Sequence, residues 1–237
     1  MKKEILLFSG GIDSLCAYFY LNKPKCLYVK LGHKYQDEEL KAVKNIAEKY
    51  DIDLEIEEME FIGKFEEDDA NIPMRNLFLS MIASFYADKI WLIVQKGETG
   101  SRGEAPDRTK DFFVNTSLTL SILNKRNIEI DSPFWNLTKQ DLVQWVLDNV
   151  EDSKEILSNS FSCFNPIDGK QCGKCSACFR QFISLAYNGI DVKDRMVHDI
   201  TKWDGIKNYV KKMKDGQYEE ERTKQTKKVL KRYGLWQ

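Results

Sequence analysis

The sequence contains no apolar run that approaches the roughly 20 residues needed to span a bilayer. Proline and glycine are scarce, at 5 and 13 of 237 residues, whereas aromatic residues reach 12%, which argues against a disordered chain. Neither sign of charge is in excess, because 36 basic residues face 37 acidic ones, and this balance excludes a chain-wide attraction to nucleic acid. The basic and then apolar start is too short for a signal peptide, and no small-residue cleavage site follows it. We therefore expect a cytoplasmic protein.

Strand-like and helix-like patterns alternate along the first 150 residues. The first predicted strand, residues 3–8, has four consecutive apolar residues, as a central parallel strand does. Residues 53–58 alternate apolar and acidic side chains, which is typical of a strand nearer the edge. Further strands are predicted at 26–31, 90–95 and 128–130, and helices at 12–21, 37–50, 75–87, 109–123 and 138–150. The alternation predicts a doubly wound, mostly parallel α/β sheet with ligands at the carboxyl ends of its strands.

A glycine-containing loop separates the first predicted strand from the first predicted helix. It consists of Phe8, Ser9, Gly10, Gly11, Ile12, Asp13 and Ser14. Glycine lets the backbone approach an anion closely, and a helix N-terminus directs free N–H groups toward it. An ionised Asp13 cannot donate a hydrogen bond, so beside phosphate it fits Mg²⁺ coordination or orientation of the loop. A plain strand–helix turn is the alternative, and there is no Gly-x-x-x-x-Gly-Lys loop.

Four of the six cysteines are clustered late in the chain: Cys163, Cys172, Cys175 and Cys178. In a cytoplasmic chain such a cluster points to a metal rather than to disulfides. Four thiolates satisfy a tetrahedral Zn²⁺ with no open position, which predicts a structural site. An iron–sulfur cluster is the alternative, because Cys-x-x-Cys-x-x-Cys also occurs in ferredoxins. Cys16 and Cys26, on a predicted helix and strand, are expected to be small core residues.

The segment Ser9-Gly10-Gly11-Ile12-Asp13-Ser14 resembles the Ser-Gly-Gly-x-Asp-Ser signature of the PP-loop ATP pyrophosphatases. Enzymes of this superfamily cleave ATP between the α and β phosphates and adenylate an oxygen of their substrate. The resemblance implies that residues 8–14 bind ATP, that Ser9, Asp13 and Ser14 act in catalysis, and that Mg²⁺ accompanies the nucleotide.

Three more segments resemble the 7-cyano-7-deazaguanine synthase (QueC) family. The cysteine module is one, with Cys172-Gly173-Lys174-Cys175 leading through Cys178 to Arg180. Ile72-Pro73-Met74-Arg75-Asn76 is similar to the family's Val-Pro-Gly-Arg-Asn. Glu98-Thr99 followed by Pro106-Asp107 and Phe112 is similar to its substrate loop. Order and spacing agree over about residues 4–187.

The resemblance implies an ATP-dependent C–N ligase that converts 7-carboxy-7-deazaguanine and ammonia to the nitrile in a queuosine or deazaguanine pathway. The implied substrate-binding residues are Arg75, Asn76, Glu98 and Asp107. Arg75 and Asn76 would contact phosphate or the base, and Asp107, with Glu98 as a second candidate, would accept from guanine-like N–H groups. Lys96 and Arg102 flank this loop as candidate partners of a carboxylate or as solvated cations.

The substrate loop departs from the family pattern. Gly100 follows Glu98-Thr99 where the family usually has Asp, and Arg102 begins a stretch that replaces Ser-Gly-Tyr. His33 begins another replaced segment, after the second predicted strand. Three alternatives stay open: a relative that stops at the amide or joins the acid to another amine, such as a protein terminus; a PP-loop enzyme that modifies tRNA; and a non-catalytic binding module, which intact Asp13 and Ser14 disfavour.

The C-terminal residues 202–237 carry 11 basic and 5 acidic residues, a net charge of +6, whereas residues 1–201 carry −7. Aromatic residues interleave with the lysines of this tail. We expect an amphipathic helical extension packed on the core or on a partner subunit, with RNA contact as the alternative. The predicted division is a PP-loop domain at 1–150, a zinc module at 151–190 and a basic helical extension at 191–237. The family resemblance also implies a homodimer.

Overall fold

The computed structural model describes residues 3–68, 70–98 and 105–236, and within them five strands form one sheet. All strand pairs are parallel, in the order β3-β2-β1-β4-β5. The strands are β1 (Glu4–Leu7), β2 (Lys25–Lys30), β3 (Leu54–Glu58), β4 (Lys89–Trp91) and β5 (Glu129–Asp131). The predicted doubly wound sheet is confirmed, with β3 at its edge. The strand order reverses between β1 and β4, and sheets of this kind bind ligands beyond the carboxyl ends of the strands at that point.

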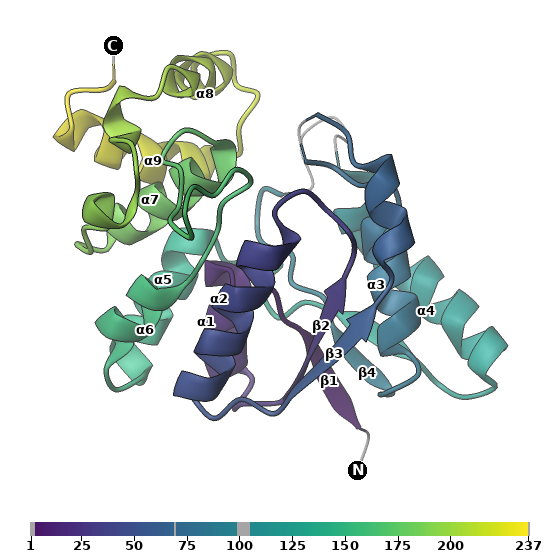
Figure 1. The fold of residues 1–237 in the computed structure, drawn as a ribbon. Helices are drawn as coiled ribbons and strands as arrows, with labels where there is room; N and C mark the ends of the chain where they lie inside the picture. Colours follow the sequence, from purple (N-terminus) through teal and green to yellow (C-terminus); the bar gives the residue numbers. More distant parts are fainter. Residues whose placement is uncertain (1–2, 69, 99–104, 237) are drawn as a thin grey trace.

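Helices cover both faces of the sheet (Figure 1). One face carries α1 (Ile12–Tyr20), α2 (Gln36–Lys49), α5 (Lys139–Asn149) and α6 (Ser153–Asn159), and the other carries α3 (Arg75–Ala83) and α4 (Lys110–Asn124). Short 3₁₀ helices follow β3 at Glu60–Phe65 and precede α4 at Pro106–Arg108. In the described part of the chain, no helix is long and apolar enough to cross a membrane.

The apolar run of β1 divides between two hydrophobic cores, because successive side chains of a strand point to opposite faces. Leu6 packs with α1, α2 and α5, whereas Ile5 and Leu7 pack with α3 and α4. Cys16 and Cys26 are buried in the first of these cores, as predicted. The loops that follow β1 and β4 are thereby held in position by the packed sheet and helices.

The C-terminal part of the chain forms three helices that pack on the first core: α7 (Ser176–Tyr187), α8 (Gly205–Lys214) and α9 (Glu220–Arg232) (Figure 1). Val229 and Leu230 of α9 are fully buried. Lys227 lies 5.0 Å from the centroid of the Trp236 ring in the tail, and Lys228 lies 5.1 Å from that of Tyr187 in α7. In the structure the extension is helical and packs on the core.

Candidate active site and metal centre

The glycine loop between β1 and α1 is tightly folded. Gly10 has a φ of +65°, a left-handed conformation that favours glycine, and Gly11 is the N-cap of α1. The Ser14 hydroxyl donates to the Gly11 carbonyl at 3.1 Å and accepts from the Ser9 backbone N–H at 3.2 Å. The loop therefore presents backbone N–H groups at a helix N-terminus, as anion sites do.

The two apolar members of the predicted ATP loop, Phe8 and Ile12, have side chains in the core, each with 1% of its surface exposed. They can contribute only backbone groups to a ligand. Their burial fixes the two ends of the loop in position.

Asp13 carries an unsatisfied oxygen beside this loop. Its Oδ2 accepts from the Lys139 ammonium, whereas its Oδ1 is buried and has no hydrogen-bond donor among the described residues. A buried acceptor without a partner is costly, and a metal cation supplied with a nucleotide would satisfy it. The chemistry of this position therefore fits Mg²⁺.

Lys139 is a site residue that the sequence reasoning missed. It is the first residue of α5, behind a capping box in which Thr138 and Asp141 satisfy each other's backbone N–H groups. Its side chain is only 12% exposed. One feature of the sequence could have identified Lys139 as a site residue. It stands at the start of the helix after β5, at the same end of the sheet as the glycine loop.

A cleft of about 1670 Å³ is lined by Glu98, a carboxylate on which the charge of Lys139 acts. Three of the four predicted substrate residues line it: Arg75, Glu98 and Asp107. Asn76 is buried behind the wall, where its amide donates to the Asp107 carbonyl at 3.2 Å. The predictions for Thr99 and Arg102 lie outside the described residues. Lys96 is paired with Glu219 at 3.5 Å.

Met74 occupies the position that is glycine in the family's Val-Pro-Gly-Arg-Asn. It caps the N-terminus of α3 with a φ of +60°, and it lines the cleft. A non-glycine residue in the left-handed region is strained, and such strain is concentrated at functional sites. Met74 thus holds a backbone conformation that favours glycine, and Arg75 starts the helix at the wall of the cleft.

Glu98 lies deep in the cleft among several cations. The Gln95 backbone N–H donates to its Oε2 at 3.3 Å, and the Arg108 guanidinium lies 3.5 Å from its Oε1. Burial alone would raise the pKa of Glu98, but Arg108, Lys139, Arg222 and Arg180 together hold that pKa below its usual value. Glu98 is therefore ionised, and Lys139 acts on both Asp13 and Glu98, which connects the glycine loop to the cleft.

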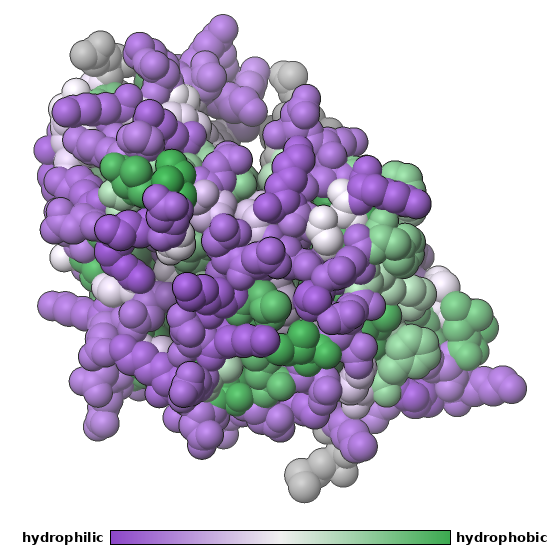
Figure 2. Space-filling view, viewed as in Figure 1, coloured by the Kyte–Doolittle hydropathy of each residue, from purple (hydrophilic) through white to green (hydrophobic). Residues whose placement is uncertain are grey.

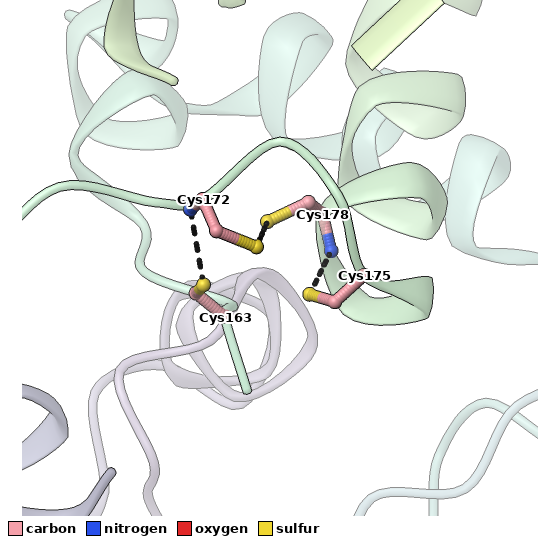
Figure 3. A group of neighbouring side chains, drawn as sticks. All are labelled: Cys163, Cys172, Cys175 and Cys178. Carbon is pink, nitrogen blue, oxygen red and sulfur yellow. Dashed lines mark hydrogen bonds between the residues drawn. The ribbon is translucent and has the colours of Figure 1, made fainter. Parts of the chain in front are cut away.

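The four clustered cysteines converge as predicted, with all four sulfur atoms within 4.8 Å of one another and buried (Figure 3). The sulfurs of Cys172 and Cys178 are 3.9 Å apart. A tetrahedral ion with metal–sulfur bonds of about 2.3 Å separates its sulfurs by about 3.8 Å. This spacing fits one ion, because a cluster of several irons and sulfides would hold its thiolates further apart.

The backbone around the cysteines is shaped to keep the sulfurs together. The Cys172 N–H donates to the Cys163 sulfur at 3.2 Å, and the Cys178 N–H donates to the Cys175 sulfur at 3.5 Å. Gly173 has a φ of +71°, and a Cβ there would lie 2.0 Å from the His198 carbonyl oxygen. Only glycine fits this turn.

The sulfurs also need a cation if all four are to be thiolates. Hydrogen bonding with Cys163 lowers the pKa of Cys172 to about 7 and holds that of Cys175 far below its usual value. The same contacts raise the pKa values of Cys163 and Cys178. Four sulfur atoms this close together repel one another as thiolates, so a divalent ion is the partner that their chemistry calls for.

The metal centre adjoins the glycine loop through two residues. The Phe161 backbone N–H donates to the Gly10 carbonyl at 3.0 Å, and the Ser162 Oγ lies 3.2 Å from where a Cβ on Gly11 would be. The Cys178 thiol donates to the Ser162 carbonyl at 3.7 Å. The cysteine site thus supports the loop directly, a placement that sequence spacing did not predict.

Comparison with known proteins gives one matching family model, described as "Queuosine biosynthesis protein QueC", over residues 3–70 and 68–188. A relative from Methanobrevibacter smithii, named 7-cyano-7-deazaguanine synthase, is 28% identical over 225 residues, with 81% of this chain and 96% of the relative covered. A protein of the same name from Staphylococcus epidermidis is 28% identical over 202 residues, with 75% of this chain and 89% of the relative covered.

Proposed function

The chain belongs to the QueC family, and from this premise we propose that it is an ATP-dependent ligase of queuosine biosynthesis that converts 7-carboxy-7-deazaguanine and ammonia to 7-cyano-7-deazaguanine. One observation carries the proposal: Lys139 pairs with Asp13 at the glycine loop and also acts on Glu98 in the cleft. An activating nucleotide and an acid bound on either side of Lys139 would therefore be neighbours.

ATP is proposed to bind with its phosphates at the glycine loop. The backbone N–H groups near Gly10 and Gly11 and the hydroxyls of Ser9 and Ser14 would donate to phosphate oxygens. Asp13 would hold Mg²⁺ through its unpartnered Oδ1, and that ion would stabilise the departing pyrophosphate. Lys139 holds the other Asp13 oxygen and keeps the side chain oriented.

The deazaguanine acid is proposed to bind in the cleft. The half-buried Asp107 suits the paired N–H donors of a guanine-like edge, and Asn76 fixes the backbone of that residue. Arg75 at the start of α3 would contact phosphate or the base, and Glu98 is the second candidate acceptor.

The reaction proceeds through two adenylations. A carboxylate oxygen attacks the α phosphorus, pyrophosphate leaves, and ammonia then displaces AMP to give the amide. The amide oxygen is adenylated in the same way, and loss of AMP and a proton gives the nitrile. Both oxygens of the acid leave in AMP, a far better leaving group than hydroxide, so two ATP are consumed for each nitrile.

The first prediction concerns the product. Purified protein incubated with the acid, ATP, Mg²⁺ and ammonia is expected to yield the nitrile, AMP and pyrophosphate in the ratio one to two to two. Mass spectrometry of the product and chromatography of the nucleotides measure this. A stable amide with one AMP would contradict nitrile formation, and an acid left unconsumed would contradict the proposed substrate.

The four-cysteine site is proposed to hold structural Zn²⁺. The sulfur spacing suits one tetrahedral ion, and four protein ligands leave no position open for a reactant. None of the six cysteines forms a disulfide, which suits a reducing compartment. We propose the cytoplasm as that compartment.

A homodimer is proposed to form through the outer face of α3 and α4. Phe85, Val114, Leu118, Ile122 and Leu123 are each more than half exposed. Figure 2 shows hydrophobic surface on the side of the molecule where these helices lie. Apolar patches of this kind on a folded protein mark interaction sites.

The second prediction follows from that face. Ile122→Glu is expected to convert a dimer to a monomer, because a carboxylate at an apolar interface is desolvated without a partner. Light scattering coupled to size-exclusion chromatography measures the mass. Val197→Glu, at an exposed apolar residue on the other side of the fold, is the control and should leave the mass unchanged. A wild-type monomer at micromolar concentration would contradict the proposal.

A further inference from the structure

One wall of the cleft comes from residues beyond position 188, where the family match ends. These residues come from the segment before α8, from α8 itself and from the start of α9. Among them are Trp203, Tyr209, Tyr218 and Arg222. The C-terminal extension, residues 189–236, therefore helps to build the substrate cleft and does more than cover the core.

Arg222 fixes the start of α9 to the loop that carries Glu98. Its guanidinium donates to the Gly97 carbonyl and, at 2.9 Å, to the Tyr218 hydroxyl, and it lies 4.6 Å from the centroid of the Tyr218 ring. Gly97 has a φ of +78°, and a Cβ on it would lie 2.6 Å from Arg222 Cδ. This close contact sets the position of Arg222 relative to Glu98.

Arg180 reaches the same place from α7. Its Cζ lies over the Phe164 ring, 5.8 Å from the centroid, and the Tyr209 side chain is a second neighbour that acts on its charge. Both contacts are with uncharged groups. Glu98 is the carboxylate whose negative charge raises the pKa of Arg180. A guanidinium at the wall of a cleft, held by neutral partners, is suited to an anionic ligand.

The local charge balance also favours an anion. Glu98 is faced by four cations, and one of these, Lys139, is already paired with Asp13. The acid at the start of α9, Glu219, is paired with Lys96. Arg108, Arg180 and Arg222 thus all act on Glu98, although Glu67, Asp107 and Asp215 also line the cleft.

We propose that Arg180 and Arg222 form an anion subsite that binds the carboxylate of the acid substrate, and that the C-terminal extension thereby sets which acid the cleft accepts. The proposal rests on the proposed function. Tyr218 is the positioning residue for Arg222.

The subsite has a clear role in the first chemical step. The substrate carboxylate and the α phosphate are both anions, and they must approach before the oxygen–phosphorus bond forms and the bond to pyrophosphate breaks. Two guanidiniums beside the carboxylate reduce this repulsion, and they remain protonated throughout. The amide formed later is neutral and loses the charge–charge attraction to them.

That difference supplies the test. Calorimetric titration of 7-carboxy-7-deazaguanine into the wild-type protein and Arg222→Ala is expected to show binding weakened about tenfold or more by the substitution. The neutral carboxamide, titrated in the same way, is expected to bind both proteins within about twofold. Arg222→Lys should recover part of the affinity for the acid, because it restores the charge without the two-pronged geometry.

Lys224→Ala is the matched control, since Lys224 is an exposed cation two residues further along α9. It should leave both affinities unchanged. Equal loss of acid and amide binding in Arg222→Ala would overturn the anion subsite and indicate a purely structural role, and so would unchanged binding of the acid. If the wild-type protein binds neither ligand, the proposed function itself fails, and that outcome is distinct from the other two.

Discussion

Asp13→Asn is expected to lower the rate of pyrophosphate release by about a thousandfold, which corresponds to roughly 4 kcal/mol of transition-state stabilisation. The amide keeps the size of the side chain but removes the negative charge that would hold a cation against the phosphates. It also leaves the Lys139 ammonium in a half-closed site without its carboxylate partner. Single-turnover measurement of AMP and pyrophosphate, with saturating acid, detects the loss at the first adenylation.

Asp111→Asn is the matched control, because Asp111 is also an acid in the first turn of a helix but is exposed at the start of α4. Its rate should equal that of the wild type. Raising the Mg²⁺ concentration should recover part of the Asp13→Asn rate if cation binding is the cause. A rate for Asp13→Asn within threefold of the wild type would remove Asp13 from the catalytic machinery.

Cys178→Ser is expected to lose one equivalent of bound zinc and to lower the melting temperature by about 10 °C or more, on the order of 4 kcal/mol. Cys178 lies on α7 and contacts both Cys172 and the Ser162 carbonyl, so its loss opens the site and releases the loop beside it. Elemental analysis measures the metal, and circular dichroism follows the melting.

Cys26→Ala is the control for losing a buried thiol outside the metal centre. It should keep the zinc and cost about 1 kcal/mol, as small cavities do. A chelator should reproduce the effect of Cys178→Ser in the wild-type protein. Iron with acid-labile sulfide in place of zinc would contradict the proposed ion, and full stability of the metal-free protein would contradict a structural role.

Periodicity predicted each strand of the sheet and the helices between them, because one face or stripe of each must be apolar. The ends of the strands and helices were predicted less accurately than their order. Residues 90–95 were predicted as one strand, but β4 ends at Trp91 and the chain then turns into the cleft. Helix α6 (Ser153–Asn159) follows α5 closely, and the sequence pattern did not predict it as a separate helix. The division of the chain at residues 150 and 190 stays a prediction.

The candidate site was predictable where a motif is local. The four cysteines and the glycine loop can each be recognised from a short stretch of sequence, and both lie as expected. Lys139, Arg180 and Arg222 come from three helices far apart in sequence, and only folding brings them to Glu98. Arg180 closes the family-like cysteine motif, but positive charges are frequent in this chain and nothing in the sequence near Lys139 or Arg222 separates these two from solvated cations. The roles of the predicted substrate residues stay predictions.

The hydrogen bond from Phe161 to Gly10 joins the proposed metal site to the proposed nucleotide site. An ion that orders the cysteines would also order residues 161 and 162, which lie against the glycine loop. If a nucleotide orders the loop in turn, binding at the two sites is linked, and reciprocity then requires each ligand to change the affinity of the other by the same factor.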